Sequence, residues 1–174
     1  MAEIVNSASW RRRVRLTQAR SVPTTPPPPT RTRPSASRGR ALRTPVTWGL
    51  AGGTLQAASP LAFSWLEPAT VYALGLSLIA AVYIGFGVAD GRREVITVEI
   101  CVASVFLVIA AVGVTGSGWL LVAGLAGHGL KDLWQHSTGF VANTRWWPPF
   151  CATVDFVAAA LLGVVLLADL RVGW

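Results

Sequence analysis

The chain has 174 residues, of which 52% are hydrophobic and only 13% are charged, against roughly 25% charged in an average soluble protein. This length allows one compact domain with a tail, and a soluble domain this small has no interior able to bury several long apolar segments. The net charge of +7 lies in residues 1–47, which hold ten arginines and one acid, so the mildly acidic remainder excludes a basic nucleic-acid-binding body.

The N-terminal segment, residues 1–45, has the composition of a disordered tail. It carries four consecutive prolines at Pro26–Pro29, many Ser and Thr residues, and few apolar ones. Its Arg-rich, acid-poor character superficially resembles an organelle transit peptide, but no apolar core follows the first arginines as a secretory signal requires. We favour two simpler interpretations: a solvated tail, or a segment added by an upstream start codon.

Residues 46–68 form an ambiguous hydrophobic segment. Between Val46 and Leu66 there is no charged residue, but the segment contains two adjacent glycines and Pro60. The pattern predicts either a weak fifth membrane span or a helix lying at the membrane interface.

Four charge-poor segments follow and predict four membrane-spanning helices. Each approaches the roughly 20 residues that a helix needs to cross the hydrocarbon layer, and short connectors rich in Gly, Pro and Asn separate them. Because backbone groups in lipid must be hydrogen-bonded within the chain, we expect an all-α transmembrane bundle over residues 69–170. The predicted spans are Ala69–Ala89, Val95–Val114, Trp119–His136 and Phe150–Leu170.

Arginines on the first and third connectors orient this bundle. Arg92 and Arg93 precede the second span and Arg145 precedes the fourth, so the positive-inside rule puts both connectors in the cytoplasm. A four-span bundle then leaves the Arg-rich tail outside, which the rule disfavours and a fifth span would correct. We take four spans as the first choice and expect a multi-pass protein of the bacterial cell membrane, with the lipid bilayer as its partner.

The third predicted span ends in a stripe of polar side chains. Their spacing of i, i+3, i+4, i+7 and i+8 gathers them on one side of a helix. In a membrane, such a stripe faces protein or water rather than lipid. The residues are His128, Lys131, Asp132, Gln135 and His136.

Acidic residues of the other spans are expected at a similar depth. Asp90 ends the first span, Glu99 lies about 7 Å of helix rise beyond Glu94, and Asp155 lies about 9 Å beyond Pro149. Because neighbouring spans run antiparallel, these acids and the stripe form one polar layer near the first and third connectors. A carboxylate at mid-membrane costs roughly 2.5–3.5 kcal/mol. For any single residue a structural ion-pair network is the simpler explanation, but for the whole layer we favour a functional site.

The layer supplies groups for several kinds of chemistry. The candidate catalytic groups are Glu99, Asp132, Asp155 and His136. The candidate substrate-binding groups are Lys131, Gln135 and Arg145. A divalent metal would use His128, Asp132 and His136. The two imidazoles are about 12 Å apart along the helix and cannot both ligate one ion without bending, so Glu99 or Asp155 would complete the site.

The blocks Tyr83–Arg92, His128–His136 and Thr144–Cys151, together with Asp155, resemble an uncharacterised family of small four-span bacterial integral membrane proteins. The resemblance covers about residues 70–170 and leaves out the tail. It implies the helical membrane fold and no activity.

The residues leave three functional classes open. One is a membrane-embedded enzyme acting on a lipid-like substrate, and another is a proton- or cation-coupled transporter, which four helices would form as a homodimer. The third is an accessory protein that stabilises a partner without catalysis. The half of the bundle near the second connector is nearly all apolar, so we favour an interfacial site over a continuous path through the membrane.

Overall fold

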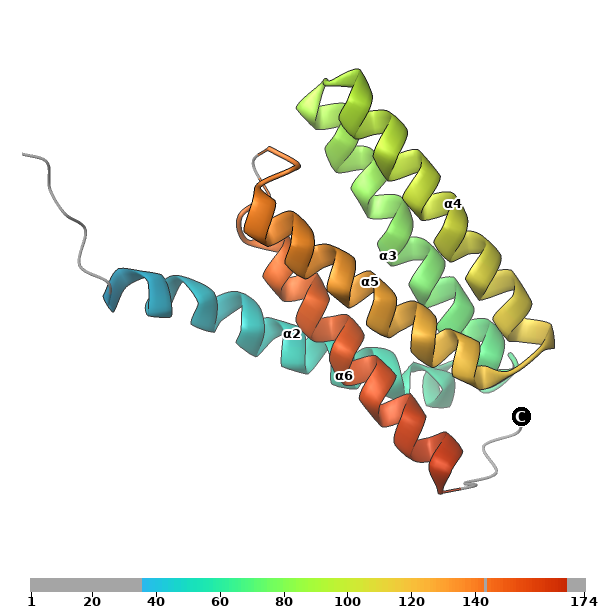
Figure 1. The fold of residues 1–174 in the computed structure, drawn as a ribbon. Coiled ribbons are helices and arrows are strands. Elements are labelled where there is room, and N and C mark those ends of the chain that lie inside the picture. Colours follow the sequence, from blue (N-terminus) through green and yellow to red (C-terminus); the bar gives the residue numbers. More distant parts are fainter. Residues whose placement is uncertain (1–35, 143, 169–174) are drawn as a thin grey trace, which may run out of the picture. The chain divides into compact units, whose positions relative to one another are not determined.

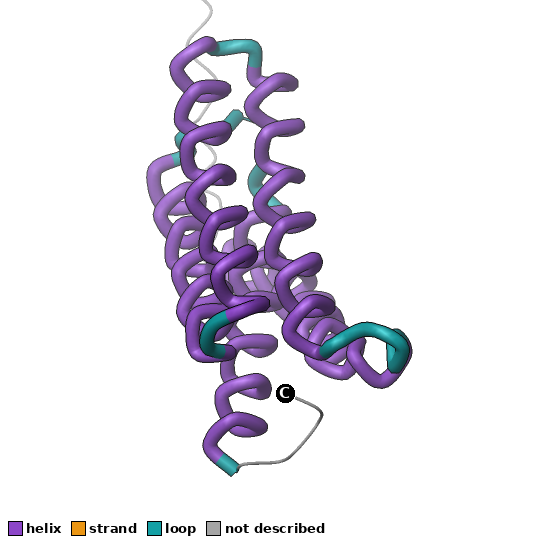
Figure 2. The backbone as a smooth tube through the Cα atoms, turned by 90° about the vertical axis from the view of Figure 1, so that its right-hand side faces the viewer, coloured by secondary structure: helices purple, strands orange, loops and turns teal. Residues whose placement is uncertain are grey.

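The computed structural model describes residues 36–142 and 144–168 (Figure 1). Over these residues it contains helices and no strand, which confirms the predicted all-α class (Figure 2). Most of the predicted tail lies outside the described residues, but its last part, from Ala36, is helical. The helices are α2 (Ala36–Ala62), α3 (Pro68–Asp90), α4 (Arg93–Thr115), α5 (Gly118–Thr138) and α6 (Trp147–Leu167).

Three of these helices are long and apolar enough to cross a membrane. They are α3, α4 and α6, and together they indicate a multi-pass membrane protein. The outer face of α4 carries exposed apolar side chains, as contact with lipid requires, among them Val105, Leu107, Val108 and Val112. Helix α5, the third predicted span, is less apolar because its second half carries the polar stripe.

Short turns fold the helices back on one another. Helix α3 begins at Pro68, whose missing N–H costs nothing in a first helical turn. It ends at Asp90, and the next residue, Gly91, adopts a left-handed φ of 81°. Helices α3 and α4 pack as one hairpin, α5 and α6 as another, and α5 also packs against α4. The apolar core lies between them and includes Leu76, Leu121, Leu125 and Leu162, each with 0% of its surface exposed.

The first and third predicted connectors meet at the same end of the bundle. Arg92 forms a two-pronged contact with Asp90, with Nε 2.6 Å from Oδ1 and Nη2 2.9 Å from Oδ2, and Nη2 also donates to the carbonyl of Phe140. The backbone N–H of Ala142 donates to Asp90 Oδ2 at 2.8 Å. Bonding to the Asp90 carboxylate raises the pKa of Arg92 above its ordinary value. The shared end that the predicted topology requires is therefore present.

Helix α2, which contains the ambiguous segment, packs closely along α6. A Cβ added to Gly49 would lie 2.5 Å from Thr153 Cβ, and one added to Gly53 would lie 2.7 Å from the carbonyl oxygen of Val154 and from Val157 Cβ. Two glycines four residues apart let helix backbones approach each other in membranes. Gly49 meets Thr153 and Gly53, one turn later, meets Val157, so the contacts advance in the same direction along both helices. Helices α2 and α6 are therefore parallel, and both begin at the end of the bundle that holds Arg92.

We expect Gly53→Ala to lower the thermal unfolding temperature in detergent, because the new methyl group meets backbone and a β-branched side chain across the α2–α6 contact. Overpacking of this kind costs about 1–3 kcal/mol. Gly85→Ala is the matched control, since a Cβ there meets nothing within 4 Å. An equal or higher unfolding temperature for Gly53→Ala than for Gly85→Ala would contradict the packing of α2 on α6.

Candidate functional site

Six polar side chains from three helices meet inside the bundle, and we name them the interior polar cluster. All are buried except Lys131, which is partly covered and keeps 11% of its side chain exposed. The spacing on α5 turns four of them inward, while α4 and α6 each contribute one acid. The cluster consists of Glu99, His128, Lys131, Asp132, Gln135 and Asp155.

Glu99 is held from two sides by side chains of α5. Its Oε2 atom lies 2.9 Å from Lys131 Nζ, and its Oε1 atom accepts a hydrogen bond from Gln135 Nε2. The same ammonium lies 3.2 Å from the centroid of the Tyr83 ring, a cation–π contact. Glu99 therefore stays bonded through both oxygens although only 1% of its side chain is exposed.

The deeper half of the cluster is a group of one imidazole and two carboxylates. His128 Nδ1 lies 2.8 Å from Asp155 Oδ2 and 3.6 Å from Asp132 Oδ2. The imidazole stands edge-on to the rings of Phe106 and Tyr83, with ring centroids 4.9 and 5.6 Å away. One ligand atom from each of His128, Asp132 and Asp155 lies within 4.8 Å of the other two.

The charges and hydrogen bonds of the cluster do not balance. Three carboxyl groups face one ammonium, so ionisation of all three beside a neutral imidazole would leave two negative charges uncompensated. Among the described residues, Asp155 Oδ1 and His128 Nε2 are buried without a hydrogen-bond partner of normal geometry, and so are both oxygens of Asp132. Each such group costs about 1–3 kcal/mol or more if it is charged. The arrangement is therefore suited to a bound cation.

The contribution of α3 to the polar layer differs from the prediction. Asp90 was expected in the layer, but it lies at the loops and bonds Arg92 and Ala142. Tyr83 faces the cluster instead, two turns deeper on α3, with 0% of its surface exposed. Sequence reasoning missed this residue. The available signal was a tyrosine seven residues before Asp90, on the same side of a helix.

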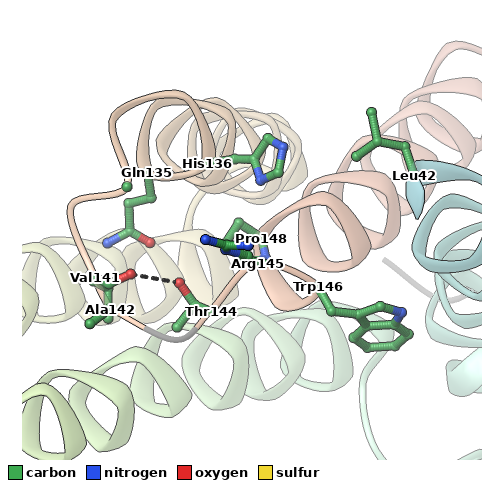
Figure 3. Close-up of a pocket in the computed structure, with 10 residues that line it drawn as sticks. Leu42, Gln135, His136, Val141, Ala142, Thr144, Arg145, Trp146 and Pro148 are labelled. Atoms are coloured by element: carbon green, nitrogen blue, oxygen red, sulfur yellow. Dashed lines mark hydrogen bonds between the residues drawn. The ribbon is translucent and has the colours of Figure 1, made fainter. Parts of the chain in front are cut away.

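Two of the predicted site residues, His136 and Arg145, are exposed and stand outside the cluster. They line a cavity of about 720 Å³ at the loop end of the bundle (Figure 3). The cavity also touches Gln135, so one side chain borders both the cavity and Glu99. His136 is thus separated from the predicted metal pair His128 and Asp132, and Asp155 is the third residue beside that pair.

Comparison with known proteins gives no match: no family model, no curated protein and no solved structure matches this chain. The resemblance to small four-span bacterial membrane proteins therefore stays a prediction. What can be concluded about the site depends on its own geometry.

We expect Lys131→Met to lower thermal stability strongly, because it leaves the buried Glu99 carboxylate without its ammonium. Breaking a buried pair from one side costs about 3–5 kcal/mol. Adding Glu99→Gln to the same chain should recover much of the loss, because the uncompensated charge is removed. Thermal unfolding of the two single variants and the double variant in detergent measures the coupling. A double variant no more stable than Lys131→Met would show that the two side chains are not energetically coupled.

Proposed function

We propose that this chain is a five-span integral membrane protein that binds a divalent cation within its interior polar cluster. The observation that carries the proposal is the grouping of His128, Asp132 and Asp155 in a buried cluster that holds three carboxyl groups and one ammonium. The proposal has two parts, the membrane topology and the cation, and each has its own test.

Five crossings account for the packing and the charge pattern together. Helix α2 has 27 residues, about 40 Å of helix, and contacts the apolar helix α6 through its glycines. Helix α5 lies between α4 and α6 and turns its polar side inward, as a span among other spans should. With five spans, the N-terminal arginines also obey the positive-inside rule. Arg38, Arg40 and Arg43 at the start of α2 would then lie on the cytoplasmic side, together with Arg92, Arg93 and Arg145.

A divalent cation would satisfy the deep half of the cluster. Two ligands of one Zn²⁺ ion lie roughly 3–3.5 Å apart, and the separations of 2.8 and 3.6 Å from His128 Nδ1 to the two carboxylates lie on either side of that value. One imidazole and two carboxylates suit divalent metals such as Zn²⁺, Mn²⁺ or Fe²⁺. When bound, such an ion supplies Lewis-acid chemistry.

Among the activities left open by the sequence, a site served from one membrane face fits better than a path through the membrane. The cavity at the loop end reaches Gln135 at the edge of the cluster. On the other side, Leu76, Leu125 and Leu162 are fully buried in the apolar core. An enzyme acting on a lipid-like substrate agrees with this asymmetry, whereas a carrier needs polar groups along its whole route.

The topology predicts which single cysteines are labelled together in intact cells. In a background of Cys101→Ser and Cys151→Ala, we expect Thr44→Cys, Glu94→Cys and Ser137→Cys to react only after the membrane is made permeable. Ser64→Cys and Thr115→Cys should react with the impermeant reagent directly. All five positions are exposed. Thr44→Cys labelled from outside together with Ser64→Cys would exclude α2 as a span, and opposite labelling of Glu94→Cys and Ser137→Cys would exclude the bundle topology.

The proposed cation site predicts that the metal content of the protein depends on His128, Asp132 and Asp155. We expect the detergent-purified chain to hold one divalent metal ion, measured by mass spectrometry of the elements. The isosteric variants Asp132→Asn and Asp155→Asn, and also His128→Ala, should lose it while keeping their elution volume and helical content.

The matched controls are His136→Ala, an exposed histidine four residues beyond Asp132, and Glu94→Gln, an exposed acid on α4. Both should keep the metal. A second measurement detects the site even if the metal is lost during purification. Co²⁺ added to the metal-free protein should give visible absorption bands in the wild type and not in Asp155→Asn. Wild-type protein without metal and without these bands would overturn the proposal.

A further inference from the structure

The cavity at the loop end, separate from the cation ligands, has the groups to recognise a particular kind of molecule. It lies between the start of α2, the end of α5, the α5–α6 loop and the start of α6 (Figure 3). At about 720 Å³ it is in the size range of sites that enclose a small ligand. Leu42, Val141 and Pro148 form its apolar part, while Arg145, His136 and Gln135 supply its polar groups.

Arg145 makes one side of the cavity basic. It is exposed, and within the described part of the chain no carboxylate lies within ion-pair distance of it. A guanidinium presents paired N–H donors that match a phosphate. Arg92, by contrast, is already bonded to Asp90, and Lys131 to Glu99. Arg145 is therefore available for an anionic group from outside.

Gln135 supplies a hydrogen-bond acceptor, its amide oxygen, at the inner side of the cavity. Its amide nitrogen donates to Glu99, and a carboxylate can only accept, so the amide oxygen must point away from Glu99. That oxygen is buried without a partner among the described residues, and only 2% of Gln135 is exposed. The end of α5 adds partial negative charge at the same place. A bare anion would leave these acceptors unsatisfied, whereas a headgroup with hydroxyl donors would bond them.

The surroundings place the cavity at the depth of lipid headgroups. Trp146 lines it and stacks on Phe150 with ring centroids 4.9 Å apart, and Trp147 lies against the same ring at 5.3 Å. Clustered tryptophans mark the interface between hydrocarbon and water. Basic pockets between spans on the cytoplasmic side are places where anionic headgroups bind. The apolar part of the cavity would take the beginning of the attached chain.

We propose that this cavity binds the headgroup of an anionic, hydroxyl-bearing phospholipid or related lipid phosphate, with Arg145 on the phosphate and the Gln135 amide oxygen on a hydroxyl. The inference concerns a site beside the cation ligands and does not require the cation. The two can fail separately, because metal content and lipid binding are measured independently on the same protein.

The test is native mass spectrometry of the full chain in detergent with short-chain lipids. We expect one molecule of phosphatidylglycerol to bind saturably, and more tightly than phosphatidylcholine, which lacks net charge, or phosphatidylmethanol, which lacks the hydroxyls. Arg145→Gln should weaken binding about tenfold, as loss of a charged hydrogen bond implies. Arg93→Gln is the matched control, because Arg93 is exposed at the same end of the bundle and does not line the cavity.

Every other outcome counts against the proposal. Equal losses in the two arginine variants would mean that general attraction to anionic lipid is being measured, and equal binding of phosphatidylcholine would remove the role of charge. Equal binding of phosphatidylmethanol would remove the role assigned to Gln135. Inorganic phosphate that competes with phosphatidylglycerol at equal concentration would identify a site for free phosphate. Thermal unfolding of Arg145→Gln checks that the chain still folds, as expected for an exposed side chain.

Discussion

The structure depends on protein side chains that pair with acidic groups buried between the helices, where water cannot solvate them. Glu99 on α4, Asp155 on α6 and Asp132 on α5 are all buried, and each would be costly to leave alone among apolar side chains. Lys131 on α5 pairs with Glu99 and His128 on α5 pairs with Asp155, so the polar stripe of α5 has to face both α4 and α6. This requirement fixes the rotation of α5 about its axis more strictly than apolar packing does, since small and branched apolar residues tolerate several arrangements.

The same rotation explains which parts of the site could be read from the sequence. At 100° per residue, Gln135 lies about 20° from His128 around α5 and Asp132 about 40°, whereas His136 lies about 80° away. The first two are buried and His136 is exposed. The spacing therefore predicted correctly that a polar face exists and that acids from α4 and α6 meet it. It failed at His136 because four-residue steps drift off the face, an error that accumulates with every turn.

Other features lay beyond the sequence because they depend on how helices meet. Asp90 was placed in the polar layer from its position at the end of a span, but the backbone N–H of Ala142, far along the chain, binds it at the loops. Tyr83 was not predicted in the polar layer because that prediction followed ionised side chains, and a tyrosine in an apolar segment is uncharged. The segment around Gly49 and Gly53 was ambiguous on hydropathy, and only its contact with α6 shows why glycines stand there. Composition is enough to predict the all-α class, but these contacts join residues far apart in the sequence and depend on how the helices pack.

Polar side chains gather toward one end of the bundle, and apolar side chains pack toward the other. Gln135 is where the two polar regions meet, because its nitrogen is committed to Glu99 and its side chain also borders the cavity. The contacts continue from Glu99 to Lys131, 2.9 Å away, and from that ammonium to Asp132 at 4.0 Å. Among the residues that the structure describes, no comparable polar connection leads from the cluster toward Leu76 and Leu125. The polar contacts of the described residues therefore run from the interior carboxylates toward the end of the bundle that carries Arg92 and Arg145.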